Sequence, residues 1–120
     1  MKLHEQPLAS MNLVARYGPG EIVINNRRLV APLLVAPGHL REDWLGDLAQ
    51  LMPAALGPVL ELQPRIVLLG SAQPPPHARA LRAAFAERQI ALEVMQLGAA
   101  CRTYNVLAQE DRAVVALLFP

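Results

Sequence analysis

Residues 65–69 of the chain read Arg-Ile-Val-Leu-Leu, and this apolar run decides the fold. A strand that is covered on both faces of a sheet has such a run, because neither of its sides meets water. Helical patterns over 77–89 and 99–109 alternate with further strand patterns over 90–95 and 113–119. This β-α-β-α-β order predicts parallel neighbouring strands joined by right-handed crossovers.

The first third of the chain is rich in strand and turn signals. Residues 12–17 and 21–24 are predicted strands, separated by a Gly-Pro-Gly turn. The two asparagines at 25–26 tolerate the positive φ of a tight hairpin, and a return strand is predicted over 28–35. Within that strand, Pro32 indicates a sheet edge or a bulge. We therefore predict a β-meander that joins the later unit in a mixed sheet.

A helix is predicted between these two parts, over residues 40–52. The apolar residues of this stretch recur at helical spacing: Trp44, Leu45, Leu48, Leu51 and Met52. We expect Trp44 to hold this helix against the sheet, and the Pro- and Gly-rich residues 53–64 to be a connection. The fold class is thus α/β, a single three-layer domain over 12–120 with a mixed central sheet, a β-rich N-terminal part and a C-terminal βαβαβ unit. Residues 1–11 are predicted to be an N-terminal lead-in.

The composition excludes several classes of protein. A chain of 120 residues fits one domain, and 53% hydrophobic with 18% charged residues excludes intrinsic disorder. The formal net charge is +1 and the basic residues are dispersed, so the chain has no basic stripe for nucleic-acid phosphates. We therefore expect no nucleic-acid partner.

Few residues are available for metal or cofactor chemistry. Lys2 is the only lysine, which excludes a P-loop lysine and disfavours Schiff-base catalysis. Cys101 is the only cysteine, so an intrachain disulfide and a cysteine-rich zinc site are excluded. The histidines, His4, His39 and His77, lack the spacing of a metal-binding motif. We expect neither a metal nor a cofactor.

The sequence also bears on location and assembly. No apolar run reaches the roughly 18 residues that a membrane span needs. Residues 1–7 lack the apolar core of a secretory signal and the Arg/Ser bias of a transit peptide. We therefore expect a cytoplasmic protein without a transmembrane segment. Its apolar helix faces and edge strands permit a homodimer without requiring one.

Two segments that follow the predicted parallel strands form a candidate ligand or partner site. Ligands of such sheets usually bind where the carboxyl ends of parallel strands meet. After the first strand, backbone N–H groups near a glycine and a serine are available to an anion. After the second strand, polar residues begin an otherwise apolar helix. The candidates are Gly70, Ser71, Cys101, Arg102, Thr103, Tyr104 and Asn105.

Each candidate also has a purely structural interpretation. The glycine and serine at 70–71 form a tight exit from a strand, and Cys101 is a small packed residue with no histidine near it in sequence. Arg102 either clamps a carboxylate or phosphate or pairs with a protein carboxylate such as Glu93 or Glu110. Tyr104 either binds a ligand or packs with its hydroxyl bonded to backbone. No catalytic constellation stands out, so we predict no catalytic residues, and enzymatic activity is disfavoured without being excluded.

Residues 99–107 and 110–118 carry a family resemblance. Their sequences, AACRTYNVL and EDRAVVALL, resemble the C-terminal signature of the Mth-like domain family, whose function is unknown. Eukaryotic relatives in that family include a mitochondrial respiratory complex I assembly factor and an adipogenesis-associated protein. The resemblance spans about residues 12–118 and is supported by YGPG at 17–20 and LLG at 68–70. It implies a three-layer α/β fold without an established activity or cofactor.

The chain departs from the family pattern at two places near the candidate site. Members of the family commonly have Gly-Thr-Gly after the first parallel strand, where this chain has Gly-Ser-Ala at 70–72. They commonly have threonine where this chain has Leu97. Both changes lower the polarity or the backbone freedom of the candidate site.

Two functions follow as alternatives. The first, which the resemblance implies, is a non-enzymatic interaction or assembly protein in the biogenesis of respiratory NADH dehydrogenase, complex I. The second is a small-molecule or anion-binding protein, or an enzyme, that uses a cleft at the C-terminal ends of the parallel strands.

Overall fold

The computed structural model describes residues 11–120, so the lead-in predicted over 1–11 lies outside the described part except for Met11. The strands are β1 (Val14–Gly18), β2 (Glu21–Ile24), β3 (Arg27–Leu29), β4 (Leu33–Ala36), β5 (His39–Glu42), β6 (Ile66–Ser71), β7 (Ala91–Met95) and β8 (Val114–Phe119). The helices are α1 (Gly57–Leu60), α2 (Ala78–Ala86) and α3 (Leu97–Gln109).

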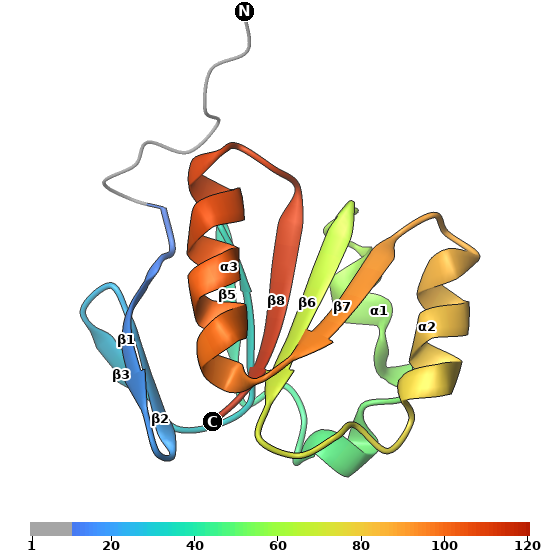
Figure 1. The fold of residues 1–120 in the computed structure, drawn as a ribbon, viewed down its shortest axis with the longest axis horizontal. Coiled ribbons are helices and arrows are strands. Elements are labelled where there is room, and N and C mark those ends of the chain that lie inside the picture. The colour runs from blue at the N-terminus through green and yellow to red at the C-terminus, as the bar shows by residue number, and fades with distance from the viewer. Residues whose placement is uncertain (1–10) are drawn as a thin grey trace, which may run out of the picture.

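The strands form a small sheet and a large sheet (Figure 1). The small sheet is antiparallel, in the order β1-β2-β3. The large sheet has the order β5-β4-β8-β6-β7, in which β6 runs parallel to both β7 and β8. Strand β4 runs antiparallel to β5 and β8, so the large sheet is mixed. The predicted βαβαβ unit and mixed sheet are confirmed. The prediction that the N-terminal meander joins the mixed sheet is wrong for β1, β2 and β3, which form the separate small sheet.

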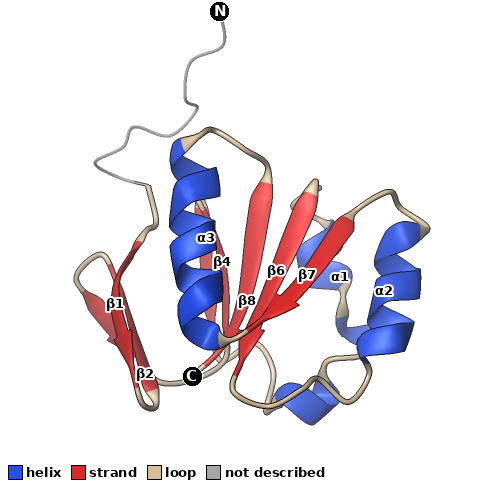
Figure 2. Ribbon diagram, in the orientation of Figure 1, coloured by secondary structure: helices blue, strands red, loops and turns tan. Residues whose placement is uncertain are grey.

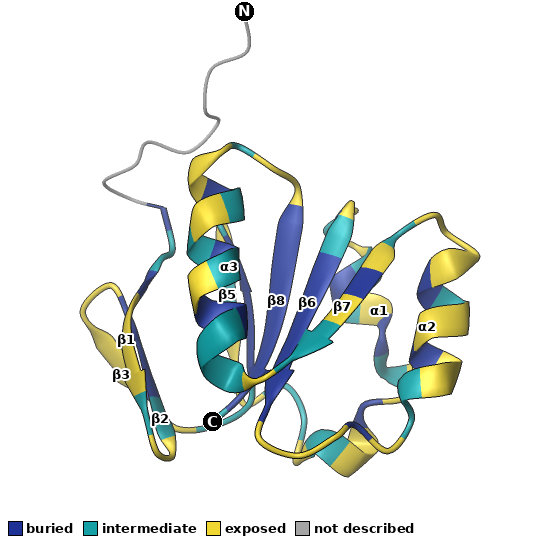
Figure 3. Cartoon of the chain, viewed as in Figure 1, coloured by how far each residue is buried: buried dark blue, intermediate teal, exposed yellow. Residues whose placement is uncertain are grey.

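Two cores cover opposite faces of the large sheet and give the fold three layers (Figure 2). Strand β8 shows the division, because its side chains alternate between the two faces. Val114, Ala116 and Leu118 join a core with α3 and the small sheet. Val115, Leu117 and Phe119 join a second core with α1 and α2. Every residue of β8 is buried, as Figure 3 shows, which is why its sequence is apolar throughout.

The helix predicted over 40–52 is wrong. Pro37 and Gly38 lie between β4 and β5, and Ala36 pairs with His39 across this hairpin, so the first residues of the stretch are a strand. Asp43 then adopts a φ of 54°, which the interior of an α-helix does not permit.

The apolar residues of that stretch still pack on the second core, although only a 3₁₀ turn forms, at Leu48–Gln50. Leu51 is buried, and Trp44 is half-buried against the same core in an irregular segment. Trp44 therefore packs where expected, but not from a helix. Apolar spacing alone did not distinguish a helix from an irregular segment with one buried side.

The single strand predicted over 28–35 is also wrong. The strand is interrupted between Leu29 and Leu33. As a result β3 belongs to the small sheet and β4 to the large one. Pro32 lies just before β4, where its missing N–H costs no ladder hydrogen bond, and its carbonyl accepts a hydrogen bond from the Asp43 N–H at 2.9 Å. Strand β4 lies between β5 and β8, so the proline marks neither an edge nor a bulge.

Candidate functional site

Three of the four residues at 102–105 bind the N-terminal segment of the chain. The Tyr104 hydroxyl donates to the carbonyl of Asn12 at 2.7 Å. The Asn105 side chain accepts from the Val14 N–H and donates to the Val14 carbonyl, both at 2.9 Å. These bonds hold the small sheet against α3.

Arg102 continues this contact at the surface. Its Nη1 donates to the Tyr17 hydroxyl oxygen at 2.5 Å. The tyrosine ring lies directly over Gly98, where an added Cβ would come within 2.6 Å of the Tyr17 hydroxyl oxygen. Gly98 lies within α3 and leaves space for an aromatic side chain from β1.

Cys101 and Thr103 lie on the same helix in different surroundings. Cys101 is 1% exposed within the core between α3 and the large sheet. Burial raises the pKa of its thiol to about 11, against the smaller opposite effect of the Arg102 charge. At neutral pH the thiol therefore stays protonated and is a poor nucleophile. Thr103 is half-buried.

Gly70 and Ser71 end strand β6 but face different neighbours. A Cβ on Gly70 would lie 2.5 Å from the Cβ of Ala100, so the glycine allows β6 and α3 to approach closely. The Ser71 hydroxyl donates to the carbonyl of Gln73 at 2.6 Å and closes the turn after the strand. Of the seven candidate residues, Ser71 lines one of the two cavities described below.

That cavity, which we call the strand-end cavity, lies where β6 and β7 end. Its volume is about 540 Å³. Its walls include Ser71, Gln73, Arg82, Val94, Met95 and Gln96. Ser71 of the first candidate segment thus borders this cavity, whereas none of residues 101–105 does. The arginine that lines it is Arg82 from α2, while Arg102 binds Tyr17.

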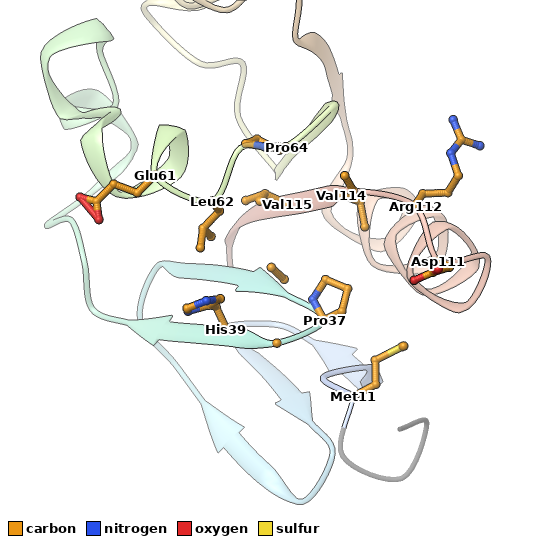
Figure 4. A pocket seen from close by; sticks show the side chains of 13 residues that line it. Met11, Pro37, His39, Glu61, Leu62, Pro64, Asp111, Arg112, Val114 and Val115 are labelled. Carbon is orange, nitrogen blue, oxygen red and sulfur yellow. The ribbon is translucent and has the colours of Figure 1, made fainter. Parts of the chain in front are cut away.

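A second cavity, of about 410 Å³, lies at the opposite ends of the parallel strands (Figure 4). Leu62 and Val115 lie near its centre. Figure 4 shows His39 on one side of this centre, and Asp111 and Arg112 on the other. The ends of the strands that border it are the ones where ligands of parallel sheets usually do not bind.

Within residues 11–120, no three His, Cys, Asp or Glu side chains are grouped as a metal site would require. None of the helices in that range is long and apolar enough to cross a membrane.

The predicted site did not include Asn12, Tyr17 or Arg82. The first two contact residues 102–105 only through the tertiary fold. Arg82 had a weak signal in the sequence, because it lies on the helix that follows the first parallel strand. The start of that helix and the end of the strand share one edge of the sheet.

Known proteins resemble this chain over almost its full length. A protein from Xanthomonas campestris, solved by NMR, is 34% identical over 96% of this chain and 89% of its own, with a TM-score of 0.82. A Bordetella pertussis protein described as a Mth938-like domain is 27% identical over 100% of this chain and 92% of its own, with a TM-score of 0.71. A Francisella tularensis subsp. holarctica (strain LVS) protein named "13 kDa major membrane protein" is 25% identical over 98% of each chain.

The Bordetella structure confirms the resemblance to Mth-like domains that residues 99–118 carry. The model of one family, described as proteins of unknown function (DUF498/DUF598), matches residues 14–119, which include both sheets and all three helices. This chain belongs to the DUF498/DUF598 family.

Proposed function

We propose that this chain is a non-enzymatic interaction domain that helps to assemble a larger protein complex. The resemblance to an assembly factor of mitochondrial complex I suggests respiratory NADH dehydrogenase as that complex. One surface on α3 is the main structural support for an interaction role.

This surface, the α3 surface, consists of Tyr17, Arg102 and Val106. Val106 follows Arg102 by one helical turn and therefore lies on the same side of α3. Tyr17 is 41% exposed and Val106 is 54% exposed, and the Arg102 guanidinium holds the tyrosine in place. Tyrosine and arginine are enriched among the residues that contribute most to protein–protein binding. A partner that covers Tyr17 and Val106 would bury apolar area while the remaining Arg102 donors bind its carbonyl or carboxylate oxygens.

The state of the other candidate residues favours binding over catalysis. The buried Cys101 thiol has a raised pKa, and no base is hydrogen-bonded to it among the contacts of the described residues. The polar groups of Tyr104 and Asn105 are occupied by backbone of residues 12–14. These side chains therefore hold the fold and are not free to act on a substrate.

Affinity purification from the organism that encodes the chain tests this role. Subunits of respiratory NADH dehydrogenase, or their membrane insertion factors, should co-purify with the tagged wild type. Recovery should fall with Arg102→Ala and with Val106→Asp, a change at an exposed position that leaves the Arg102–Tyr17 bond in place. Arg79→Ala, which removes an exposed arginine from α2, is the matched control and should retain the partners. Equal recovery with all variants, or recovery of the chain alone, contradicts the proposal.

We place this activity in the cytoplasm, where newly made subunits are accessible. Cell fractionation tests the location, and recovery in the membrane fraction in the absence of any partner would contradict it. That outcome would bring the chain closer to its Francisella relative, whose name describes a membrane protein. Sedimentation of the purified chain tests the homodimer that its edge strands permit.

A further inference from the structure

The strand-end cavity lies at a change of direction in the topology of the sheet. After β6 the chain crosses to α2, whose Leu81 and Phe85 belong to the second core. After β7 it crosses to α3, whose Ala100 and Tyr104 belong to the first core on the opposite face. Strands β6 and β7 are neighbours, so their outgoing loops separate and leave a crevice between them. Such switch points are where open α/β sheets usually bind ligands.

The size and walls of this cavity suit a small organic molecule. A volume of about 540 Å³ is within the range of ligand pockets in proteins. Val94 and Met95 at the end of β7 supply apolar wall, and the amides of Gln73 and Gln96 supply polar groups. The combination fits a ligand with a short apolar body and one polar end.

The charged residue that lines the cavity indicates which charge the polar end of the ligand carries. Arg82 is the one charged residue among those that line the cavity, all of which belong to the described range. Its Nη1 donates to the carbonyl of Leu92 at 3.0 Å, which fixes the guanidinium beside the edge strand β7. A guanidinium has five N–H donors, so this bond leaves others for a ligand. Arginine commonly binds carboxylates through two parallel hydrogen bonds.

We propose that the strand-end cavity binds a small organic acid. The carboxylate lies on the Arg82 guanidinium, and its apolar chain lies against Val94 and Met95. This site differs from the α3 surface and does not rest on the proposed interaction role. It places the anion on a residue of α2, whereas the sequence had suggested Arg102 on α3.

Titration of the ¹⁵N-labelled full chain with hexanoate, followed by NMR, tests the proposal. We expect saturable shifts of the backbone resonances of Ala72, Ala78 and Gln96, which border the cavity, and none at Val106 on the α3 surface. Hexanamide has the same apolar chain without the charge and should bind more weakly. Inorganic phosphate has the charge without the apolar chain and should also bind more weakly.

Three variants locate the binding on the cavity. Arg82→Gln should raise the Kd for hexanoate about tenfold or more, since a hydrogen-bonded charge is lost. Arg79→Gln removes the charge of an exposed arginine on the same helix that does not line the cavity, and should leave the Kd unchanged. Ala78→Leu narrows the cavity while the Arg82 side chain is retained, and should also weaken binding.

Several results would overturn the assignment. Equal binding of hexanamide excludes an anion site, and equal binding of phosphate excludes an organic acid. Absence of saturable shifts with hexanoate excludes the site altogether. A Kd that is unchanged in Arg82→Gln, with the spectrum of the folded chain retained, excludes the role of Arg82.

Discussion

The side-chain amide of Asn105 is hydrogen-bonded to both backbone groups of Val14, 91 residues away in the chain. It presents one acceptor and one donor side by side, as a neighbouring strand would, and so pairs with the outer edge of β1. Asn105 therefore joins the small sheet to α3 through a single side chain. An amide is needed at this position, because a carboxylate lacks the donor and a hydroxyl is too short to make both bonds.

Asn105→Ala tests this contact. The substitution removes the side chain that bonds to the Val14 N–H and carbonyl. Val14 is only 7% exposed, so these two groups lose their partner in a buried place. We expect the free energy of unfolding in urea to fall by about 2 kcal/mol or more. Gln109→Ala, at an exposed position of the same helix, is the control and should change it by less than about 0.5 kcal/mol. Equal effects of the two variants would argue against the role of Asn105.

Tyr104→Phe separates the hydroxyl of this tyrosine from its ring. The ring stays in the core, but the carbonyl of Asn12 loses its donor. We expect a loss of about 1 kcal/mol in the free energy of unfolding, and faster amide hydrogen exchange in β1. Tyr17→Phe is the matched comparison, since it removes a hydroxyl bonded to exposed Arg102, and its effect should be smaller. A larger loss of unfolding free energy in Tyr17→Phe than in Tyr104→Phe would contradict the prediction that the Tyr104–Asn12 bond contributes more to stability.

Gly70→Ala should separate α3 from β6. The added methyl group would lie 2.5 Å from the Cβ of Ala100, so the helix must shift. We expect a loss of about 1–3 kcal/mol, measured by chemical unfolding. The double variant Gly70→Ala with Ala100→Gly should recover part of this loss, despite the cost of glycine within a helix. Gly57→Ala, where an added Cβ meets nothing within 4 Å, should be near neutral.

The raised pKa of Cys101 predicts a pH dependence of stability. The thiol has a pKa of about 11 in the folded chain, above its ordinary value of 9.0. As the pH rises, the folded state therefore keeps the thiol proton up to a higher pH than the unfolded state does. The contribution of the Cys101 thiol to the free energy of unfolding is fully present below pH 9 and is lost as the pH rises toward 11. Urea unfolding should show the wild type losing stability relative to Cys101→Ala over this range, and parallel curves for the two would contradict the prediction.

The part of the fold that sequence analysis predicted correctly rests on local signals. The apolar run at 65–69 and the alternation of helices and strands after it indicate a parallel unit without any information from distant residues. The turn signals near 18–20 and 25–26 likewise predict hairpins that the structure contains. The failure over 40–52 has a local cause as well, because a one-sided apolar pattern suits an irregular segment as well as a helix.

The roles of residues 102–105 could not be predicted from the sequence. Buried polar groups need partners, but the pattern does not name them. For Arg102 and Tyr104 the partners are 85 and 92 residues away, on β1 and just before it, and the position of this segment depends on the whole fold. A cleft was expected at the C-terminal ends of the parallel strands, but Arg82 could be identified as a residue of the strand-end cavity only once α2 had been placed.

The bonds from α3 to β1 also constrain how the chain folds as it is made. The N-terminal strands are synthesised first, but the helix that covers them ends at Gln109. Until that helix has left the ribosome, the small sheet can form its hairpins but cannot pack against α3. Domains usually fold as units during synthesis, and contacts between distant residues slow folding. A newly made chain therefore exposes Ile22 and Ile24 until α3 emerges, because both side chains are buried in the core that α3 completes.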